Sequence, residues 1–408
     1  MTEKKYDIIV FGATSFVGQI LCRYMLDEYG LQRDVRWAAA GRSQAKLESV
    51  RSSLGSGARE LPLIVADALS EPDMTELCKQ TRLVISTVGP YALYGEALVK
   101  ACAETGTDYV DLTGEAQWVR KMIYAYEPRA RETGARIVPS CGFDSIPSDM
   151  GVWHLQSNAR ARFGQNCTQV AMRVKAAKGG ASGGTIASML NLVEEASKDS
   201  QLRKELTDPY SLCPPGTPRN KAQRSIQTAQ KDPIAGTWVA PFVMAAINER
   251  VVMRSNALAP YADGFTYNEA VMTRPGFGGA VAANAMVAGM GAFMLAAALP
   301  PTRAALERFV LPSPGEGPSP EAQENGYYDL RFFGTTKDGQ TIRTKVTGDR
   351  DPGYGSTAKM LAEAGICLAL EVSKDERRGG FWTTATAFDE RLINRLTRNA
   401  GLGFEVLG

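Results

Sequence analysis

The stretch Tyr6-Asp-Ile-Ile-Val-Phe11 runs directly into Gly12-Ala-Thr-Ser-Phe-Val-Gly18. A short apolar strand is followed by a turn between two glycines, and apolar residues then recur at helical spacing from Val17 to Met25. Glycine lets the backbone approach a pyrophosphate, and the following helix N-terminus supplies free N–H groups. The order strand, glycine turn, helix therefore predicts a dinucleotide-binding site at the start of a Rossmann domain.

The turn departs from the three-glycine fingerprint, because Ser15 stands where the middle glycine is expected. A strand-to-helix turn that binds nothing is the alternative, but the helix that follows favours nucleotide binding. The predicted cofactor-binding residues of this turn are Gly12, Thr14, Ser15, Phe16, Val17 and Gly18.

The residues expected to read the ribose follow a second apolar strand, 35–40, as Gly41-Arg42-Ser43. An enzyme that uses NAD usually has Asp or Glu here, to accept hydrogen bonds from the ribose hydroxyls, and no acid is present. Gly41 leaves space, Arg42 can pair with a 2′-phosphate and stack on adenine, and Ser43 can donate to the phosphate. These residues predict NADP (NADPH) as the cofactor.

The composition of the 408-residue chain excludes several classes of protein. Lys+Arg total 46 and Asp+Glu 44, so there is no basic excess for nucleic acid. Seven cysteines without a Cys-x-x-Cys pair indicate a reducing, cytoplasmic environment, and no signal peptide is expected before the first strand. The single histidine, His154, is expected to pack on a helix, and no metal site is predicted.

Apolar strands alternate with amphipathic helices up to about residue 140, which predicts a doubly wound parallel sheet. Ligands bind beyond the carboxyl ends of such strands. The further strands are expected over 61–66, 83–88, 107–112 and 135–139.

Polar residues follow these strands. Asp67 is expected to accept the adenine amino group, and the residues after the next strand are expected near the pyrophosphate and nicotinamide ribose, namely Thr87, Val88, Gly89 and Pro90. Tyr91 and Tyr94 come next and are candidate proton donors. The candidate substrate residues are Cys141, Phe143 and Asp144, although packing and loop capping are the alternatives.

After residue 150 the pattern changes to period-two alternation, which predicts an antiparallel sheet in an α+β second domain. The expected strands are 167–175, 250–254, 265–269, 327–333 and 340–346. A Gly/Ser loop over 178–185 supplies Lys178 as a weaker catalytic candidate and Gly183 as a substrate candidate, and a Pro-rich loop near 212–233 is expected to be mobile. We expect domains at 1–150 and 151–350, with a helical segment at 351–408 that returns to the first.

One uncharged segment, 279–299, is long enough to span a membrane. It consists mostly of Ala and Gly and contains Asn284, so spanning is disfavoured. The alternatives are a buried helix, a homodimer interface, a wall beside a lipid-like substrate, or contact with a membrane surface, although few basic residues flank it.

An ordered series of motifs resembles the saccharopine dehydrogenase-like oxidoreductases, in particular their trans-acting enoyl reductase branch. The motifs are Phe11-Gly-Ala-Thr-Ser-Phe-Val-Gly18, Ala40-Gly-Arg-Ser43, Thr87-Val-Gly-Pro-Tyr91, Asp111-Leu-Thr-Gly-Glu115, Cys141-Gly-Phe-Asp-Ser145, Ser182-Gly-Gly-Thr-Ile-Ala-Ser188, Asp208-Pro-Tyr210 and Asp351-Pro-Gly-Tyr354. The resemblance runs almost end to end. It implies a Rossmann domain with an inserted antiparallel-sheet domain, a nicotinamide cofactor, and an acyl substrate made by a separate synthase.

Three functions remain open at this point. The first is NADPH-dependent reduction of an enoyl double bond in a fatty-acyl or polyketide chain, presented by a synthase or carrier protein. The second is a saccharopine-type dehydrogenase of amino-acid adducts, whose carboxylates would need clustered arginines; Arg173, Arg250 and Arg254 are scattered. The third is a non-catalytic NADP-binding scaffold, because no proton donor is obvious from the residues.

Overall fold

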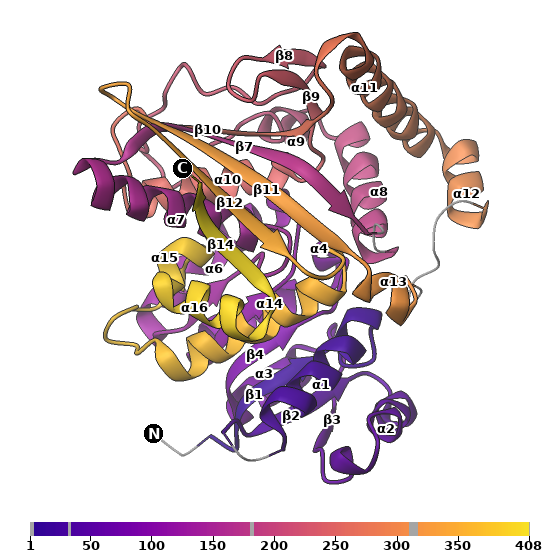
Figure 1. Ribbon diagram of the computed structural model, residues 1–408. Helices are drawn as coiled ribbons and strands as arrows, with labels where there is room; N and C mark the ends of the chain where they lie inside the picture. The colour runs from indigo at the N-terminus through magenta and orange to yellow at the C-terminus, as the bar shows by residue number, and fades with distance from the viewer. Residues whose placement is uncertain (1–3, 32–33, 180–182, 310–316, 408) are drawn as a thin grey trace. The chain divides into compact units, whose positions relative to one another are not determined.

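The computed structural model describes residues 4–31, 34–179, 183–309 and 317–407 (Figure 1). It divides into two compact units. The first comprises Met1–Phe143 and Gly353–Ala400, and the second comprises Asp144–Pro352 and Gly401–Gly408. The second unit thus combines a segment inserted into the first with the C-terminal residues of the chain.

The first unit is built on a seven-stranded parallel sheet in the spatial order β13-β6-β5-β4-β1-β2-β3. Chain order reverses between β4 and β1, which is the switch point of a doubly wound sheet. This confirms the predicted Rossmann fold. The strands are β1 (Tyr6–Phe11), β2 (Trp37–Gly41), β3 (Leu63–Val65), β4 (Thr81–Ser86), β5 (Asp108–Asp111), β6 (Arg136–Val138) and β13 (Gly380–Phe381).

Helices cover this sheet because its central strands are apolar on both faces; all six residues of β1 are buried. α14 packs against α1 and against β4 and β5, while α5 packs between α3 and α6. The helices are α1 (Phe16–Tyr29), α2 (Gln44–Ser53), α3 (Glu71–Gln80), α4 (Tyr91–Tyr94), α5 (Glu96–Thr105), α6 (Ala116–Thr133), α14 (Gly355–Ile366), α15 (Thr384–Phe388) and α16 (Glu390–Asn399), with a 3₁₀ turn at Ser56–Ala58 and a π-helical turn at Cys367–Glu371.

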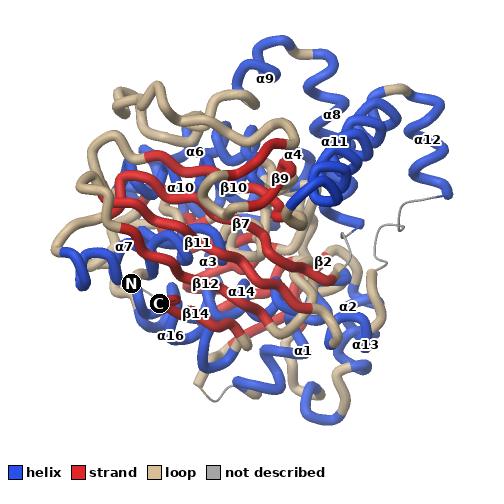
Figure 2. Tube along the Cα trace, turned by 45° about the horizontal axis from the view of Figure 1, so that its top comes forward, coloured by secondary structure: helices blue, strands red, loops and turns tan. Residues whose placement is uncertain are grey.

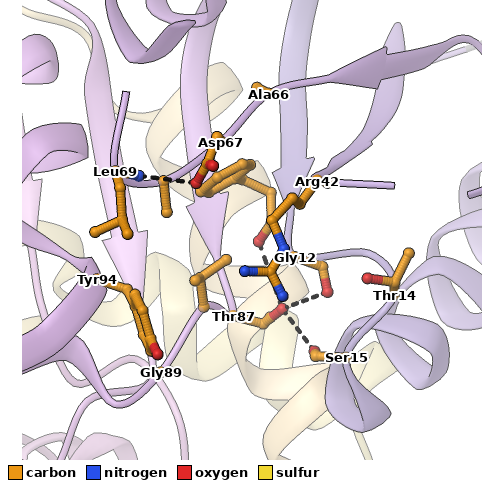
Figure 3. A pocket seen from close by; sticks show the side chains of 14 residues that line it. Gly12, Thr14, Ser15, Arg42, Ala66, Asp67, Leu69, Thr87, Gly89 and Tyr94 are labelled. Atoms are coloured by element: carbon orange, nitrogen blue, oxygen red, sulfur yellow. Dashed lines mark hydrogen bonds between the residues drawn. The ribbon is translucent and has the colours of Figure 1, made fainter. Parts of the chain in front are cut away.

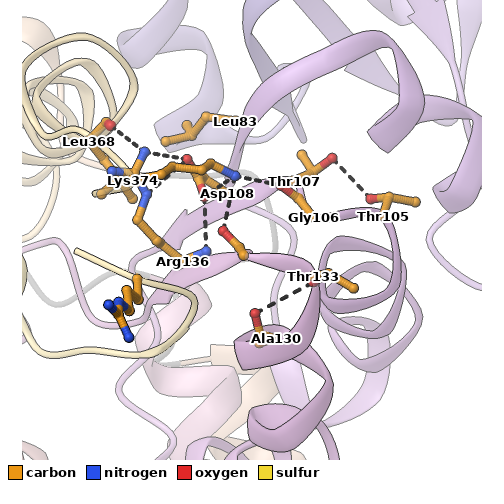
Figure 4. A network of polar contacts seen from close by, with 12 residues as sticks. Leu83, Thr105, Gly106, Thr107, Asp108, Ala130, Thr133, Arg136, Leu368 and Lys374 are labelled. Carbon is orange, nitrogen blue, oxygen red and sulfur yellow. Dashed lines mark hydrogen bonds and ion pairs between the residues drawn. The ribbon is translucent and has the colours of Figure 1, made fainter. Parts of the chain in front are cut away.

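A buried ion pair ties the returning C-terminal segment to this sheet (Figure 4). Arg136 on β6 donates to Asp108 on β5 at 2.5 Å, and both side chains are almost fully buried. The same guanidinium donates to the carbonyl oxygens of Leu368 and Val372. Because the charge is neutralised and its N–H groups are bonded, the pair can lie inside the fold.

The second unit contains a seven-stranded sheet in the order β14-β12-β11-β7-β10-β9-β8 (Figure 2). It is antiparallel as predicted except at β7 and β10, which run parallel, so the sheet is mixed. The strands are β7 (Cys167–Lys178), β8 (Gln230–Asp232), β9 (Thr237–Pro241), β10 (Thr266–Met272), β11 (Tyr327–Thr336), β12 (Thr341–Gly348) and β14 (Leu402–Leu407).

Two helices, α7 and α10, pack on this sheet and on each other. The strand predicted over 250–254 is wrong, because these residues lie within α10. Val251, Val252 and Met253 are buried there, and so short an apolar run fits either structure. The helices of this unit are α7 (Ile146–Phe163), α8 (Gly183–Lys198), α9 (Ser200–Glu205), α10 (Ala245–Leu258), α11 (Gly276–Ala298), α12 (Pro300–Phe309) and α13 (Pro320–Glu324).

We expected all of 351–408 to return to the first unit, but the last strand of this segment belongs to the second unit. Residues 353–400 return to the first unit, but β14 pairs with β12 in the second sheet, with Val346 opposite Phe404. Pairing between strands distant in sequence leaves no local signal, so helical spacing earlier in the segment could not reveal it.

The apolar segment 279–299 lies in α11, and its interpretation as a buried helix is wrong. Among the described residues of α11 only Gly279, Ala283 and Ala297 are buried, while Phe277 is 86% and Leu295 64% exposed. Among the described residues, α11 is the one helix long and apolar enough to cross a membrane, by length and composition alone. It contacts β9, α8 and α12.

Candidate cofactor site

The turn between β1 and α1 requires glycine at both ends. Gly12 has φ +92°, and a Cβ there would lie 2.6 Å from the Thr87 hydroxyl oxygen. A Cβ on Gly18 would lie 2.1 Å from the Gly12 carbonyl oxygen. The close approach of α1 to this turn therefore depends on both glycines, as the sequence pattern predicts.

Ser15 has two structural roles that a glycine could not fill. Its Oγ accepts a hydrogen bond from Gly18 N at 2.9 Å and so caps α1. The same oxygen lies 2.9 Å from Thr87 Oγ1, which also donates to the Gly12 carbonyl oxygen. Serine in place of the fingerprint glycine thus preserves the tight turn. Its hydrogen bond to Thr87 joins the turn to the residue that follows β4.

A pocket of about 270 Å³ opens beside this turn (Figure 3). It lies over the carboxyl ends of β1, β2, β3 and β4, where a doubly wound sheet binds its ligand. The predicted residues that line it are Gly12, Thr14, Ser15, Gly41, Arg42, Asp67, Thr87, Val88, Gly89 and Tyr94.

Four further residues line the pocket and were not predicted: Phe11, Ala66, Ala68 and Leu69. The available signal was their position at the end of β1 for Phe11 and directly after β3 for the other three. Phe16, Val17, Gly18, Ser43 and Pro90 were predicted but do not line it. They lie beside it in the chain, where Phe16 packs edge-on against Tyr354 at 4.7 Å and Ser43 caps α2.

The pocket suits a phosphorylated ribose next to Arg42. The Arg42 side chain is exposed and makes no ion pair or hydrogen bond with any residue that the structure describes. It stands one residue before Ser43, whose Oγ accepts from Lys46 N at the start of α2. A free guanidinium beside a helix N-terminus favours an anion, so these residues fit NADP.

Tyr91 is wrong as a proton donor. It is 3% exposed, its hydroxyl donates to the Ser86 carbonyl oxygen at 3.0 Å, and its ring packs on Trp118. Buried Glu115 accepts from Tyr91 N and Ala92 N, and so caps α4. Tyr91 therefore holds the loop after β4 instead of facing a ligand.

Cys141 is also a structural residue and is wrong as a substrate contact. It is fully buried, and its thiol donates to the Val138 carbonyl oxygen at 3.3 Å. Its backbone N donates to the carbonyl oxygen of Asp111. The buried Asp111 carboxylate accepts from Ser140 N and Thr113 N, and burial raises its pKa to about 6.

Four candidates remain. Phe143 and Asp144 come shortly after Cys141, and Lys178 and Gly183 lie later in the chain. Phe143 is half-buried, and its backbone N donates to Thr357 Oγ1 at 2.9 Å. Asp144 is half-buried and accepts no hydrogen bond from a described residue; burial, followed by the charge of Glu269, raises its pKa to about 7. Lys178 is exposed at the end of β7, and Gly183 begins α8, while 180–182 of the predicted loop lie outside the described residues.

Fold and pocket together define a Rossmann-type protein that binds NADP. The saccharopine dehydrogenase NADP binding domain matches residues 8–138, which confirms the predicted cofactor. Trans-acting enoyl reductases from Mycobacterium tuberculosis and Mycobacterium ulcerans are 37% and 36% identical to this chain, over 97% of it and 96% of theirs. The chain belongs to the saccharopine dehydrogenase-like oxidoreductases, in the family of the trans-acting enoyl reductases.

A solved structure supports the fold. Apo saccharopine dehydrogenase (L-Glu forming) from Saccharomyces cerevisiae aligns with a TM-score of 0.53, covering 99% of this chain and 100% of its own. The two sequences are 12% identical, so the likeness concerns architecture alone. The family membership makes the protein an NADP-dependent oxidoreductase, and the solved structure agrees with the predicted fold class.

Proposed function

We propose that this protein reduces the carbon–carbon double bond of an enoyl-thioester on a fatty-acyl or polyketide chain. The observation that carries the proposal is the end-to-end identity of 36–37% with relatives named trans-acting enoyl reductase. When bound, NADPH supplies a hydride, which enoyl reduction requires at the β carbon. The Gly12–Gly18 turn would bind the pyrophosphate, Arg42 the 2′-phosphate and Asp67 the adenine amino group.

We propose Asp144 as a substrate contact. Burial raises the pKa of its carboxyl group to about 7, so the group is partly protonated near neutral pH. Asp144 follows Phe143, whose backbone is bonded to Thr357 in the first unit. Phe143 and Gly183 remain proposed substrate contacts, and Lys178 is the proposed cation for the developing enolate charge.

The saccharopine-type alternative would require free arginines for the substrate carboxylates. Arg173 pairs with Asp232 at 2.5 Å, and both side chains are buried. Arg250 donates to the carbonyl oxygens of Ala246 and Leu206, and Arg254 to that of Leu212. Since these three guanidiniums are engaged within the fold, they favour the enoyl substrate over a polycarboxylate.

The decisive assay follows NADPH oxidation at 340 nm with crotonyl-pantetheine and, separately, with the amino and carbonyl components whose reductive coupling gives saccharopine; with saccharopine itself it follows the reduction of NADP+ at the same wavelength. We expect turnover with the enoyl-thioester. Turnover only with the amino-acid substrates would replace the proposal with the saccharopine-type reaction. Tight NADPH binding with no turnover of either class would favour the non-catalytic scaffold.

We further propose that the acyl chain reaches the protein on a separate synthase or its carrier protein, as the relatives' name implies for them. The test compares crotonyl-pantetheine with the same acyl group on a purified carrier protein. A higher kcat/KM for the carrier-bound substrate would support presentation by a partner, and equal values would contradict it.

We propose a cytoplasmic protein whose α11 touches lipid at a membrane surface. Seven free cysteines support the reducing compartment. Residues 276–299 carry no charge, and the helix is 23 residues, about 35 Å, long. The test is co-sedimentation with phosphatidylcholine vesicles, comparing the wild type with Phe277→Ser/Leu295→Ser. Loss of co-sedimentation in the variant would support lipid contact. If instead the wild type is a dimer in solution and the variant a monomer, α11 is a homodimer interface.

A further inference from the structure

Tyr94 was predicted beside the nicotinamide, and its surroundings differ from those of Tyr91. Tyr91 is buried and bonded, whereas Tyr94 is half-exposed and lines the pocket. Its hydroxyl makes no hydrogen bond, and its ring no aromatic contact, with any residue in the described part of the chain. The ring is therefore available to a ligand.

Most residues of the pocket that Tyr94 lines follow β1, β2 and β3. Thr87, Val88 and Gly89, which follow β4 across the switch point, complete its walls with Tyr94, and the loops after β5 and β6 contribute nothing to it among the described residues. In a doubly wound sheet the two halves of a dinucleotide lie on either side of the switch point. The half over β1, β2 and β3 carries Arg42 and Asp67, which suit the 2′-phosphate and the adenine amino group.

At the mouth of the pocket, side chains on two opposite sides leave space for a flat ring between them. Tyr94 and Leu69 lie on one side and Arg42 on the other (Figure 3). Leu69 is 65% exposed, which leaves an apolar side chain uncovered at the mouth. Aromatic rings and guanidiniums both stack on bases, and the apolar leucine would gain from being covered.

We infer that Tyr94 packs against the adenine ring of NADP, opposite Arg42 and beside Leu69, and is a cofactor-binding residue instead of the proton donor. The inference rests on the NADP cofactor and not on the enoyl substrate. On the short helix α4, Tyr91 is buried against Trp118 whereas Tyr94 lines the pocket, and Glu115 fixes the first turn of the helix.

The test uses adenosine 2′,5′-bisphosphate, which carries the adenine and the 2′-phosphate but no nicotinamide. Its Kd and that of NADPH are measured by isothermal titration calorimetry. We expect Tyr94→Ala to weaken both ligands by the same factor, about ten- to a hundredfold, since stacking on the base is lost. Tyr94→Phe should bind both as the wild type does.

Leu93→Ala is the matched control, because Leu93 is 52% exposed on the same short helix and does not line the pocket. It should leave both dissociation constants unchanged. If Tyr94→Ala lowers the thermal midpoint of unfolding, the same two dissociation constants are measured for Tyr94→Leu and Leu69→Asp. These variants leave no empty space at position 94, and they should also weaken both ligands. Weaker NADPH binding with an unchanged Kd for the bisphosphate would overturn the inference, as would unchanged binding of both ligands.

Discussion

The Oγ of Ser15 and the Oγ1 of Thr87 lie 2.9 Å apart, which joins the turn after β1 to the end of β4. The Thr87 hydroxyl also donates to Gly12, and the Ser15 hydroxyl also caps α1. In the usual fingerprint a glycine occupies the position of Ser15 and could make neither bond. Here the phosphate turn is held by side-chain hydrogen bonds between neighbouring strands of the sheet.

Ser15→Ala should lower the free energy of unfolding by about 1 kcal/mol, because the Gly18 N–H at the start of α1 loses its acceptor. Ser15→Gly removes the same acceptor, but glycine is itself a favourable N-cap residue, so this substitution should cost only a few tenths of a kcal/mol. Urea unfolding followed by circular dichroism measures both values. An unchanged free energy of unfolding in Ser15→Ala would contradict the capping role.

Gly12→Ala should impair both folding and NADPH binding. The new Cβ would meet the Thr87 hydroxyl at 2.6 Å, in a left-handed conformation that side chains disfavour. We expect a lower thermal midpoint and at least tenfold weaker binding of NADPH. Gly57→Ala is the control, since a Cβ there meets nothing within 4 Å. A Gly12→Ala variant with wild-type affinity would refute the assignment of the phosphate turn.

Arg42→Asp should convert the preference for NADPH into one for NADH. The guanidinium would be replaced by an acid that repels a 2′-phosphate and accepts from the ribose hydroxyls. We expect the Kd for NADPH to rise about ten- to a hundredfold and that for NADH to stay or fall. Arg59→Asp makes the same charge change at an exposed residue outside the pocket and should alter neither constant. An unchanged preference in Arg42→Asp would rule out the 2′-phosphate contact.

Asp108→Ala should destabilise the first unit by about 3–5 kcal/mol, since it leaves Arg136 as a buried charge without its carboxylate. Glu76→Ala removes an ion pair with Lys79 in which both side chains are more than half exposed, and should change stability by less than about 0.5 kcal/mol. Chemical denaturation of both variants checks this. Similar losses in the two would show that burial of the Arg136 pair is unimportant.

The stability of the second unit should fall as the pH rises. Burial raises the pKa of Glu249 from an ordinary value of 4.5 to about 8 and also raises that of neighbouring Glu269. Between pH 4.5 and about 8 the folded state holds a proton on Glu249 that the unfolded state has lost, so this group lowers the free energy of unfolding by at most about 1.4 kcal/mol per pH unit, and Glu269 acts in the same direction.

The pH effect can be tested with Glu249→Gln, whose single amide oxygen retains the acceptor for the backbone N of Glu269, while its NH2 group faces the Ser225 hydroxyl, which can accept. Urea unfolding between pH 5 and 8 should show a smaller slope in this variant than in the wild type. Glu60→Gln, at an exposed position in the first unit, should keep the wild-type slope. A wild-type stability that rises over this range would contradict the prediction.

The sequence by itself determined the Rossmann sheet and the cofactor. Both depend on local features: apolar runs of strand length, glycines at a strand-to-helix turn, and Arg42 where an acid would select NAD. Because the carboxyl ends of parallel strands share one edge, position along the chain was enough to bring together Gly12, Arg42, Asp67 and Thr87.

Only the tertiary structure decided which polar side chains face the pocket and which hold the fold. Tyr91 and Tyr94 lie on one turn of helix, and burial against Trp118 separates their roles. Likewise, the composition of α11 could not reveal whether other elements cover it, and the pairing of β14 with β12 joins distant segments. Hydrophobic patterning fixes the secondary structure of a segment, whereas its exposure and partners depend on the packing of the whole chain.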